Sequence, residues 1–145
     1  MTMKAKKSGF TLIELLIAIV IVGILVSIAV PSYQKSVQKA RRSDAKVALE
    51  KAAVLQEQHY FANSVFTTST DDLGGSATTL LSPEGHYTVT AALVGGNTNT
   101  FVLTATALLS SPQWDDTDCR KLILDNTGTR SSLDSANSDS TSICF

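Results

Sequence analysis

Residues 10–30 read FTLIELLIAIVIVGILVSIAV, an apolar run interrupted by a single charge, Glu14. As an α-helix rising about 1.5 Å per residue, the run is about 31 Å long and matches the ~30 Å hydrocarbon core of a bilayer. Lys4, Lys6 and Lys7 precede it, which favours a cytoplasmic N-terminus. The sequence therefore predicts one membrane-spanning helix, with the rest of the chain on the far side of the membrane.

Glu14 is the residue that an ordinary membrane anchor does not explain. A carboxylate isolated in hydrocarbon costs several kcal/mol unless it is neutralised or paired, and no nearby side chain is basic. A cleaved secretory signal ending near Ser27-Ile28-Ala29 is one alternative, and a plain anchor is another, but neither provides a partner. Cleavage after Gly9 would provide one, because it creates an α-ammonium at Phe10, four residues before Glu14.

The N-terminal residues resemble the class III signal of type IV pilins. The matching stretch is Lys6-Lys7-Ser8-Gly9-Phe10-Thr11-Leu12-Ile13-Glu14-Leu15-Leu16. The resemblance implies that the prepilin peptidase cleaves between Gly9 and Phe10, where it requires a small residue before the cut, and that the same enzyme N-methylates Phe10. It also implies that Glu14 pairs with the Phe10 amine of an adjacent subunit during filament assembly.

Two helix-breaking residues lie in or just after the apolar run. Relative to alanine, glycine costs a helix about 1 kcal/mol and proline about 3 kcal/mol, so Gly23 and Pro31 are weak points. Pro31 should also kink the helix. This is either an ordinary kink at the membrane exit or, as the resemblance implies, the end of a segment that melts on assembly.

Residues 32–61 predict an amphipathic continuation of the helix because they are rich in helix-forming residues. One face repeats at spacings of three and four, which indicates packing against a sheet. This face consists of Ala45, Ala48, Leu49, Ala52, Leu55 and His59. Arg41, Arg42 and Lys46 lie off it, and we expect either a solvated face or a contact with the acidic half of a neighbouring subunit.

The C-terminal half predicts a small antiparallel sheet. Residues 62–85 are rich in loop-forming residues, whereas 86–94 and 100–108 alternate apolar and polar side chains around a Gly-Gly-Asn hairpin. A third strand is expected over 119–125 and a short fourth one over 129–131, so the sheet lies within 86–131. A long helix on a sheet of three to four strands is an α+β fold, the ladle shape of a pilin.

Two further motifs resemble PilE-type minor pilins. Tyr60-Phe61-Ala62-Asn63-Ser64-Val65-Phe66 resembles their "YYxxNxxY" passage, with Phe61 and Phe66 in place of tyrosines. Cys119-Arg120-Lys121-Leu122-Ile123-Leu124-Asp125-x-x-Gly128 resembles their third-strand motif, which a second cysteine near the C-terminus completes, here Cys144.

The chain has only two cysteines, in a segment expected outside the cytoplasm. An oxidising compartment favours a bond between Cys119 and Cys144, and two reduced thiols or a metal pair are the alternatives. The bond would close a D-region, 119–144, and its loop would contribute roughly 3–4 kcal/mol in the loop-entropy account.

Charge and composition argue against several function classes. The net charge is −1, and residues 71–145 carry −6, with Arg120, Lys121 and Arg130 as their only basic residues, so direct binding of nucleic acid is not expected. No zinc spacing, nucleophile elbow or phosphate loop occurs, so no enzyme, metal or cofactor is predicted. His59 is expected to pack against the core, and acidic runs 115–118 and 134–139 are expected to be solvated turns rather than calcium ligands.

The sequence therefore predicts a type IV pilin closest to PilE-type minor pilins. It divides into a leader (1–9), a membrane and polymerisation helix (10–30) and a head (31–145). The expected partners are the prepilin peptidase, other pilin subunits and the inner-membrane assembly machinery, in a pilus for adhesion, twitching motility or DNA uptake. The precursor is expected in the inner membrane and the product on the cell surface.

A type II secretion pseudopilin and a non-polymerising membrane-anchored adhesin are the alternatives. The motifs do not separate major from minor subunits.

Overall fold

The structure is a computed structural model that describes residues 9–75 and 79–145. Its main element is helix α1 (Leu12–Asn63), which contains Gly23 and continues through Pro31. The chain forms two compact units that meet between Ser36 and Val37 in α1. The predicted membrane helix and amphipathic helix are thus parts of one 52-residue element.

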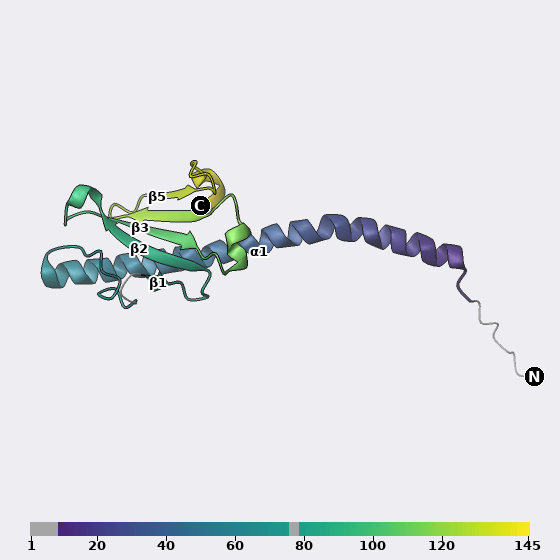
Figure 1. Cartoon of the computed structure of the whole chain (residues 1–145), viewed down its shortest axis with the longest axis horizontal. Helices are drawn as coiled ribbons and strands as arrows, with labels where there is room; N and C mark the ends of the chain where they lie inside the picture. The colour runs from purple at the N-terminus through teal and green to yellow at the C-terminus, as the bar shows by residue number, and fades with distance from the viewer. Residues whose placement is uncertain (1–8, 76–78) are drawn as a thin grey trace, which may run out of the picture. The chain divides into compact units, whose positions relative to one another are not determined.

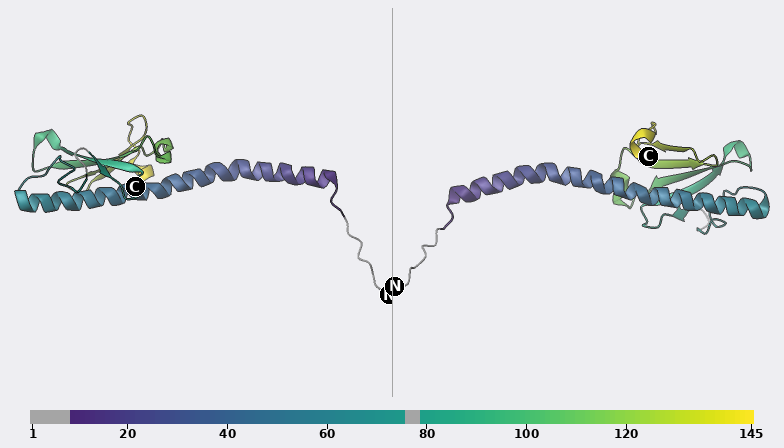
Figure 2. Two further views of the ribbon diagram at one scale, coloured as in Figure 1. Left: turned by 60° about the horizontal axis from the view of Figure 1, so that its bottom comes forward. Right: turned by 180° about the vertical axis from the view of Figure 1, so that it is seen from behind.

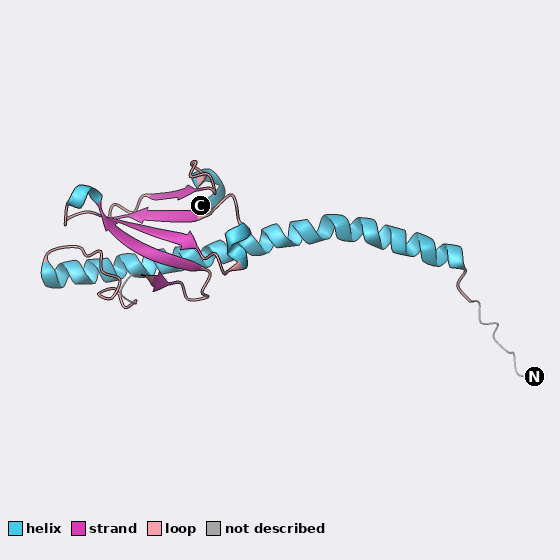
Figure 3. Cartoon of the chain, in the orientation of Figure 1, coloured by secondary structure: helices cyan, strands magenta, loops and turns pink. Residues whose placement is uncertain are grey.

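The second unit contains a five-stranded antiparallel sheet in the order β1-β2-β3-β4-β5 (Figure 1, Figure 3). The strands are β1 (Leu80–Leu81), β2 (Tyr87–Leu93), β3 (Phe101–Ala107), β4 (Lys121–Asp125) and β5 (Arg130–Leu133). The short helices η1 (Val94–Gly96), η2 (Pro112–Asp115) and α2 (Thr141–Cys144) lie between or after them. The C-terminal part of α1 runs along one face of this sheet (Figure 2).

The predicted α+β fold is confirmed, with one strand more than expected. The first three predicted strands match β2, β3 and β4 to within two residues at each end. The additional strand, β1, lies inside the predicted loop 62–85 and pairs Leu80 with Val89 and Leu81 with Thr88. A strand of two residues is too short to produce an alternating pattern, so no sequence signal marks β1.

The core lies between α1 and the inner face of the sheet. The helix contributes Ala45, Ala48, Leu49 and Ala52, all at most 2% exposed, which confirms the predicted stripe over these positions. Its small alanines allow the helix to approach the strands closely. The sheet contributes one inward residue at each second position, including Tyr87, Val89, Phe101, Leu103, Ala105, Leu122 and Leu124.

His59, expected to pack against the core, lies outside the core cluster, and its side chain is 18% exposed. Its Nδ1 lies 2.9 Å from the carbonyl oxygen of Val65, and its Nε2 lies 3.8 Å from the carboxylate of Asp72. The buried position nearest this end of the helix is Gln56, whose amide donates to the Thr67 carbonyl oxygen and accepts from the Thr67 N–H. Polar contacts with the following loop therefore accompany the stacking of Tyr60 on the buried Phe66 here.

Arg42 occupies a position that the sequence analysis assigned to a solvated or intersubunit face, and that prediction was wrong. The residue is only 8% exposed. Its guanidinium donates to both carboxylate oxygens of Asp116, at 2.7 and 2.9 Å, and to the carbonyl oxygen of Ile143 at 3.3 Å. The error has a physical cause, because this bidentate partner lies 74 residues away in a loop that no helical period can reveal.

A second buried charge, Asp44, attaches the turn before β2 to the helix. Its carboxylate accepts hydrogen bonds from the Ser82 hydroxyl and from the N–H groups of Glu84 and His86. These three donors satisfy the carboxylate, and among the described residues it has no cationic partner. The position of the β1–β2 turn therefore depends on this side chain of α1.

The D-region is closed by a disulfide between Cys119 and Cys144, as the sequence predicts. Both cysteines are buried, and their Cα atoms are 5.8 Å apart. The bond attaches α2 beside the start of β4, and a β-bridge between Leu133 and Asp139 attaches the intervening segment. A polar segment with few apolar side chains is thereby held to the sheet.

The buried ion pair gives a test of this architecture. Replacing one partner of a buried pair leaves the other charge without compensation, which typically costs 3–5 kcal/mol. We therefore expect Arg42→Ala to lower the free energy of unfolding of the full chain in detergent by about 3 kcal/mol. Denaturant titration followed by the fluorescence of Trp114 measures this change.

Arg41→Ala is the matched control, because it removes the neighbouring arginine, for which no ion pair is found in the described part of the chain. We expect an effect within about 0.5 kcal/mol, as for most surface substitutions. Equal unfolding midpoints for the two variants would contradict the role given to Arg42.

Candidate processing and assembly site

The peptide bond between Gly9 and Phe10 lies outside α1, which begins at Leu12. Both residues are exposed, and the Phe10 side chain is 92% exposed. A Cβ added to Gly9 would meet no atom within 4 Å, so packing within the chain does not require glycine there. A requirement for a small residue would therefore come from an enzyme that acts on this bond. Lys4, Lys6 and Lys7 of the predicted leader lie outside the described residues.

Glu14 is held by a residue that the sequence analysis did not consider as its partner. Its carboxylate accepts from the N–H and the hydroxyl of Thr11, at 2.9 and 2.8 Å, and its own N–H lies 3.2 Å from the Thr11 hydroxyl oxygen. This is a reciprocal capping box, and the Thr-x-x-Glu spacing at the start of an apolar run is its sequence signature. A carboxylate has about four acceptor sites, so the box leaves Glu14 able to accept from an ammonium as well.

The apolar surface of α1 between Leu12 and Val30 has no cover within the described part of the chain. Every residue in this range is exposed. By length and composition α1 is able to cross a membrane. An apolar surface of this extent normally contacts lipid or another protein.

Gly23 and Pro31 both lie within this uncovered helix region or at its end. No atom lies within 4 Å of a Cβ added to Gly23, so nothing in the described chain packs on it. Pro31 has no N–H to donate to the carbonyl oxygen of Ser27, which removes one hydrogen bond from the helix. The segment between the two residues is thus intrinsically less stable than the rest of α1.

The three basic residues of the C-terminal half each contact a partner within the head. The Arg120 guanidinium lies 3.9 Å from the ring centroid of Trp114. The Lys121 Nζ donates to Asn137 at 2.8 Å, and Arg130 pairs with Glu50 at 2.7 Å. Arg120 and Trp114 are both partly exposed, so they form a cationic and aromatic surface at the start of β4.

The two acidic runs, residues 115–118 and 134–139, differ in how their carboxylates are bonded. Asp116 is buried against Arg42, so residues 115–118 do not present three free carboxylates. Asp134 accepts from the N–H groups of Ala136 and Ser138, as expected for a polar turn. Within residues 9–75 and 79–145, no group of three or more His, Cys, Asp or Glu side chains is placed to hold a metal ion.

Two family models match the chain. The prokaryotic N-terminal methylation motif matches residues 4–30. The model described as type IV minor pilin ComP, DNA uptake sequence receptor, matches residues 31–123, well over half of the chain. The two matches are adjacent and together extend from the leader to β4.

Curated pilins are similar over most of the chain. A fimbrial protein of Neisseria meningitidis is 31% identical over 106 residues, and the alignment covers 67% of this chain and 61% of that protein. The fimbrial protein EcpC of Eikenella corrodens is 36% identical (72% and 65%), and the type IV major pilin protein PilE1 of Neisseria gonorrhoeae is 36% identical (74% and 62%). The chain thus spans less than two thirds of each of these relatives. A solved type IV pilin from Shewanella oneidensis is 25% identical with a TM-score of 0.45, covering 64% of this chain and 89% of that one.

Proposed function

The chain belongs to the type IV pilin family, and from that premise we propose that it is a minor subunit of a type IV pilus, assembled through its N-terminal helix. The observation that carries the proposal is the adjacency of the two matches, a methylation motif over 4–30 and a minor pilin domain over 31–123. The role is structural, and no catalytic step is assigned to the chain.

We propose that the precursor is anchored in the inner membrane by residues 10–30, with its basic leader in the cytoplasm. The prepilin peptidase then cleaves between Gly9 and Phe10 and methylates the new amine. The exposure of this bond, one residue before the Thr11 cap of α1, supports the assignment, because a protease needs access to an extended segment. Removal of the leader, residues 1–9, leaves the charge of Glu14 four residues from an ammonium.

Assembly then follows from the cost of an unpaired carboxylate in an apolar medium. The capping box with Thr11 satisfies hydrogen bonds but supplies no positive charge. We propose that the Phe10 ammonium of an adjacent subunit pairs with Glu14 and that α1 helices of several subunits cover one another's apolar surfaces. Melting of the helix between Gly23 and Pro31 would then adapt the subunit to the filament.

The partners of this proposal are the prepilin peptidase, other pilin subunits and the inner-membrane assembly machinery, and the product is a pilus on the cell surface. The pseudopilin alternative has the same N-terminal motif. The disulfide-closed D-region favours a pilus subunit over it, since major pseudopilins usually lack that loop. A non-polymerising adhesin would not need the carboxylate at Glu14.

A paired test addresses processing and assembly. Intact-mass analysis of surface material should show a chain that begins at N-methylated Phe10. Glu14→Val should still be cleaved but should fail to enter filaments, because the bond is intact while the partner of the ammonium is lost. Sheared pili and membranes are compared by mass spectrometry and immunoblotting.

The control variant is Glu57→Val, which removes an exposed carboxylate from the same helix within the head. It should assemble at the level of the unmodified chain. A surface species beginning at Met1 or Val30 would contradict the processing step, and normal assembly of Glu14→Val would contradict the role given to Glu14. Absence of the unmodified chain from sheared pili would favour the adhesin alternative.

A second function, DNA binding by the assembled subunit, is favoured by the description of the matched family as a DNA uptake sequence receptor. The expectation against DNA binding was based on the net charge of the head, which does not report local surfaces. The Arg120–Trp114 surface is a local exception, because a guanidinium beside an aromatic ring suits phosphate contact and base stacking.

Mobility-shift titration with purified pili tests this second function. If the surface binds DNA, Arg120→Ala should weaken binding about tenfold, by loss of a contact worth 1–3 kcal/mol. Lys51→Ala, which removes an exposed lysine from α1 instead, should leave binding within about twofold. The absence of any shift at low salt, where phosphate contacts are strongest, would exclude this function.

A further inference from the structure

The face of α1 opposite the sheet carries a second apolar stripe. Val47, Val54 and Phe61 recur every seven residues and are 56%, 56% and 86% exposed. Seven residues correspond to nearly two helical turns, so the three side chains form one line. This line lies on the side of the helix away from the buried Ala45, Ala48, Leu49 and Ala52. Nothing in the described head covers it.

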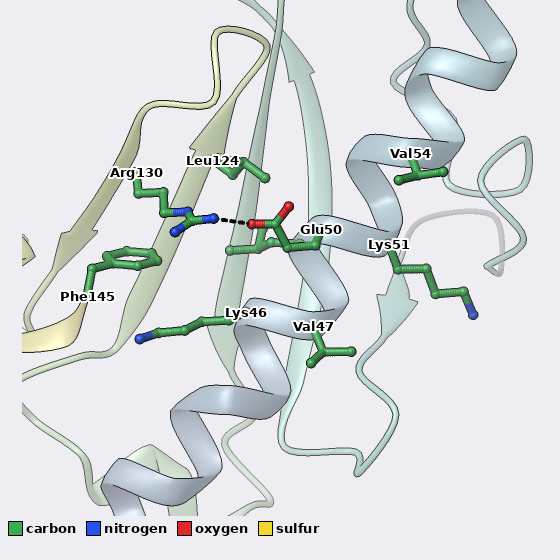
Figure 4. A pocket seen from close by; sticks show the side chains of 9 residues that line it. Lys46, Val47, Glu50, Lys51, Val54, Leu124, Arg130 and Phe145 are labelled. Carbon is green, nitrogen blue, oxygen red and sulfur yellow. Dashed lines mark hydrogen bonds and ion pairs between the residues drawn. The ribbon is translucent and has the colours of Figure 1, made fainter.

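A groove opens beside this stripe, between α1, the last two strands and the C-terminal segment (Figure 4). Its volume is about 550 Å³, within the range of ligand sites. The apolar lining includes Val47, Val54, Leu124 and Phe145, and Lys46 and Lys51 also line it. Lys46 lies 4.9 Å from the Phe145 ring centroid, and Arg130 is paired with Glu50. We call the stripe and groove together the lysine–valine face.

The helix that carries this face differs in net charge from the rest of the head. Residues 37–63 contain five basic and three acidic residues, a net charge of +2, whereas residues 64–145 contain three basic and nine acidic residues, a net charge of −6. Burial and the neighbouring Arg130, Arg42 and Lys39 all lower the pKa of Lys46. Arg42 is paired with Asp116 and Arg130 with Glu50, whereas no ion pair is found for Lys46 or Lys51 in the described part of the chain, so these two lysines carry the positive charge of the lysine–valine face.

We propose that the lysine–valine face docks on the anionic lipid surface of the membrane that anchors the precursor. The valines and Phe61 enter the interface between headgroups and acyl chains, while Lys46 and Lys51 contact lipid phosphates. Apolar side chains flanked by lysines are the composition of helices that lie in this interface. The acidic remainder of the head is repelled by the same surface, which selects the helix side for contact.

The docking rests on the proposed anchoring, which keeps the head of an unassembled subunit close to lipid. Pro31 lies where the membrane segment meets the head, and its missing hydrogen bond weakens the helix there. Docking would cover the exposed apolar stripe of an unassembled subunit until other subunits are available.

Lysine acylation of the full-length precursor in vesicles tests the proposal. Vesicles of phosphatidylcholine alone are compared with vesicles that also contain phosphatidylglycerol, and each lysine is quantified by mass spectrometry. We expect labelling of Lys46 and Lys51 to fall about fivefold in the anionic vesicles. Lys121, on β4, should not change, and high salt should restore labelling because it screens the contact.

Matched variants separate the apolar part of the contact from bulk charge. Val54→Asp places a carboxylate on the face, and Val94→Asp places one on the β2–β3 hairpin, at a valine of similar exposure, 52%. We expect Val54→Asp to abolish the protection of Lys46 and Lys51 and Val94→Asp to preserve it. Both positions are exposed, so both heads should fold.

Three outcomes would overturn the proposal. Equal labelling in the two kinds of vesicle would show no anionic lipid contact. Protection that persists in phosphatidylcholine and rises with protein density would assign the face to a second copy of the chain. If the precursor fails to float with vesicles, the proposed membrane anchoring is contradicted. If it floats but its lysines are not protected, only the proposed docking is contradicted.

Discussion

The uncovered apolar surface of α1 determines what the rest of the chain has to provide. From Leu12 to Val30 every residue is exposed, and no part of the described chain packs on it. Such a helix requires a membrane or other helices as its surroundings, and its one charge requires a partner in either. The Thr11–Glu14 capping box satisfies that charge by hydrogen bonds alone, so it leaves the electrostatic requirement open.

Buried polar side chains of the same helix hold the loops of the head, while the sheet packs on its apolar stripe. Gln56 holds the loop after α1, Asp44 holds the turn before β2, and Arg42 holds the loop that contains Asp116. Each contact fixes a segment with little regular structure, where apolar packing is sparse. Because removal of one partner leaves a buried polar group unsatisfied, these residues determine loop positions more sharply than the alanine stripe does.

The sequence predicted features that repeat along the chain or occur within a few residues of one another. The alanine stripe of α1 and the three central strands follow from periodicity, and Cys119 and Cys144 follow from having no competing cysteine. Arg42 was misplaced because its partner, Asp116, lies in a loop that returns to the helix from far along the sequence. The Thr11 cap follows from its Thr-x-x-Glu spacing, which is visible in the sequence.

The net charge of the chain conceals three regions of different charge. The net charge of −1 is the sum of a basic leader, a weakly basic helix and an acidic sheet region. After loss of the leader, the remaining helix charge is opposite in sign to that of the sheet region. Such a subunit can contact an anionic surface through its basic helix side, while its acidic sheet side is repelled by that surface. The average charge of such a chain therefore predicts neither its solubility nor its partners, because each contact is governed by the charge of one side.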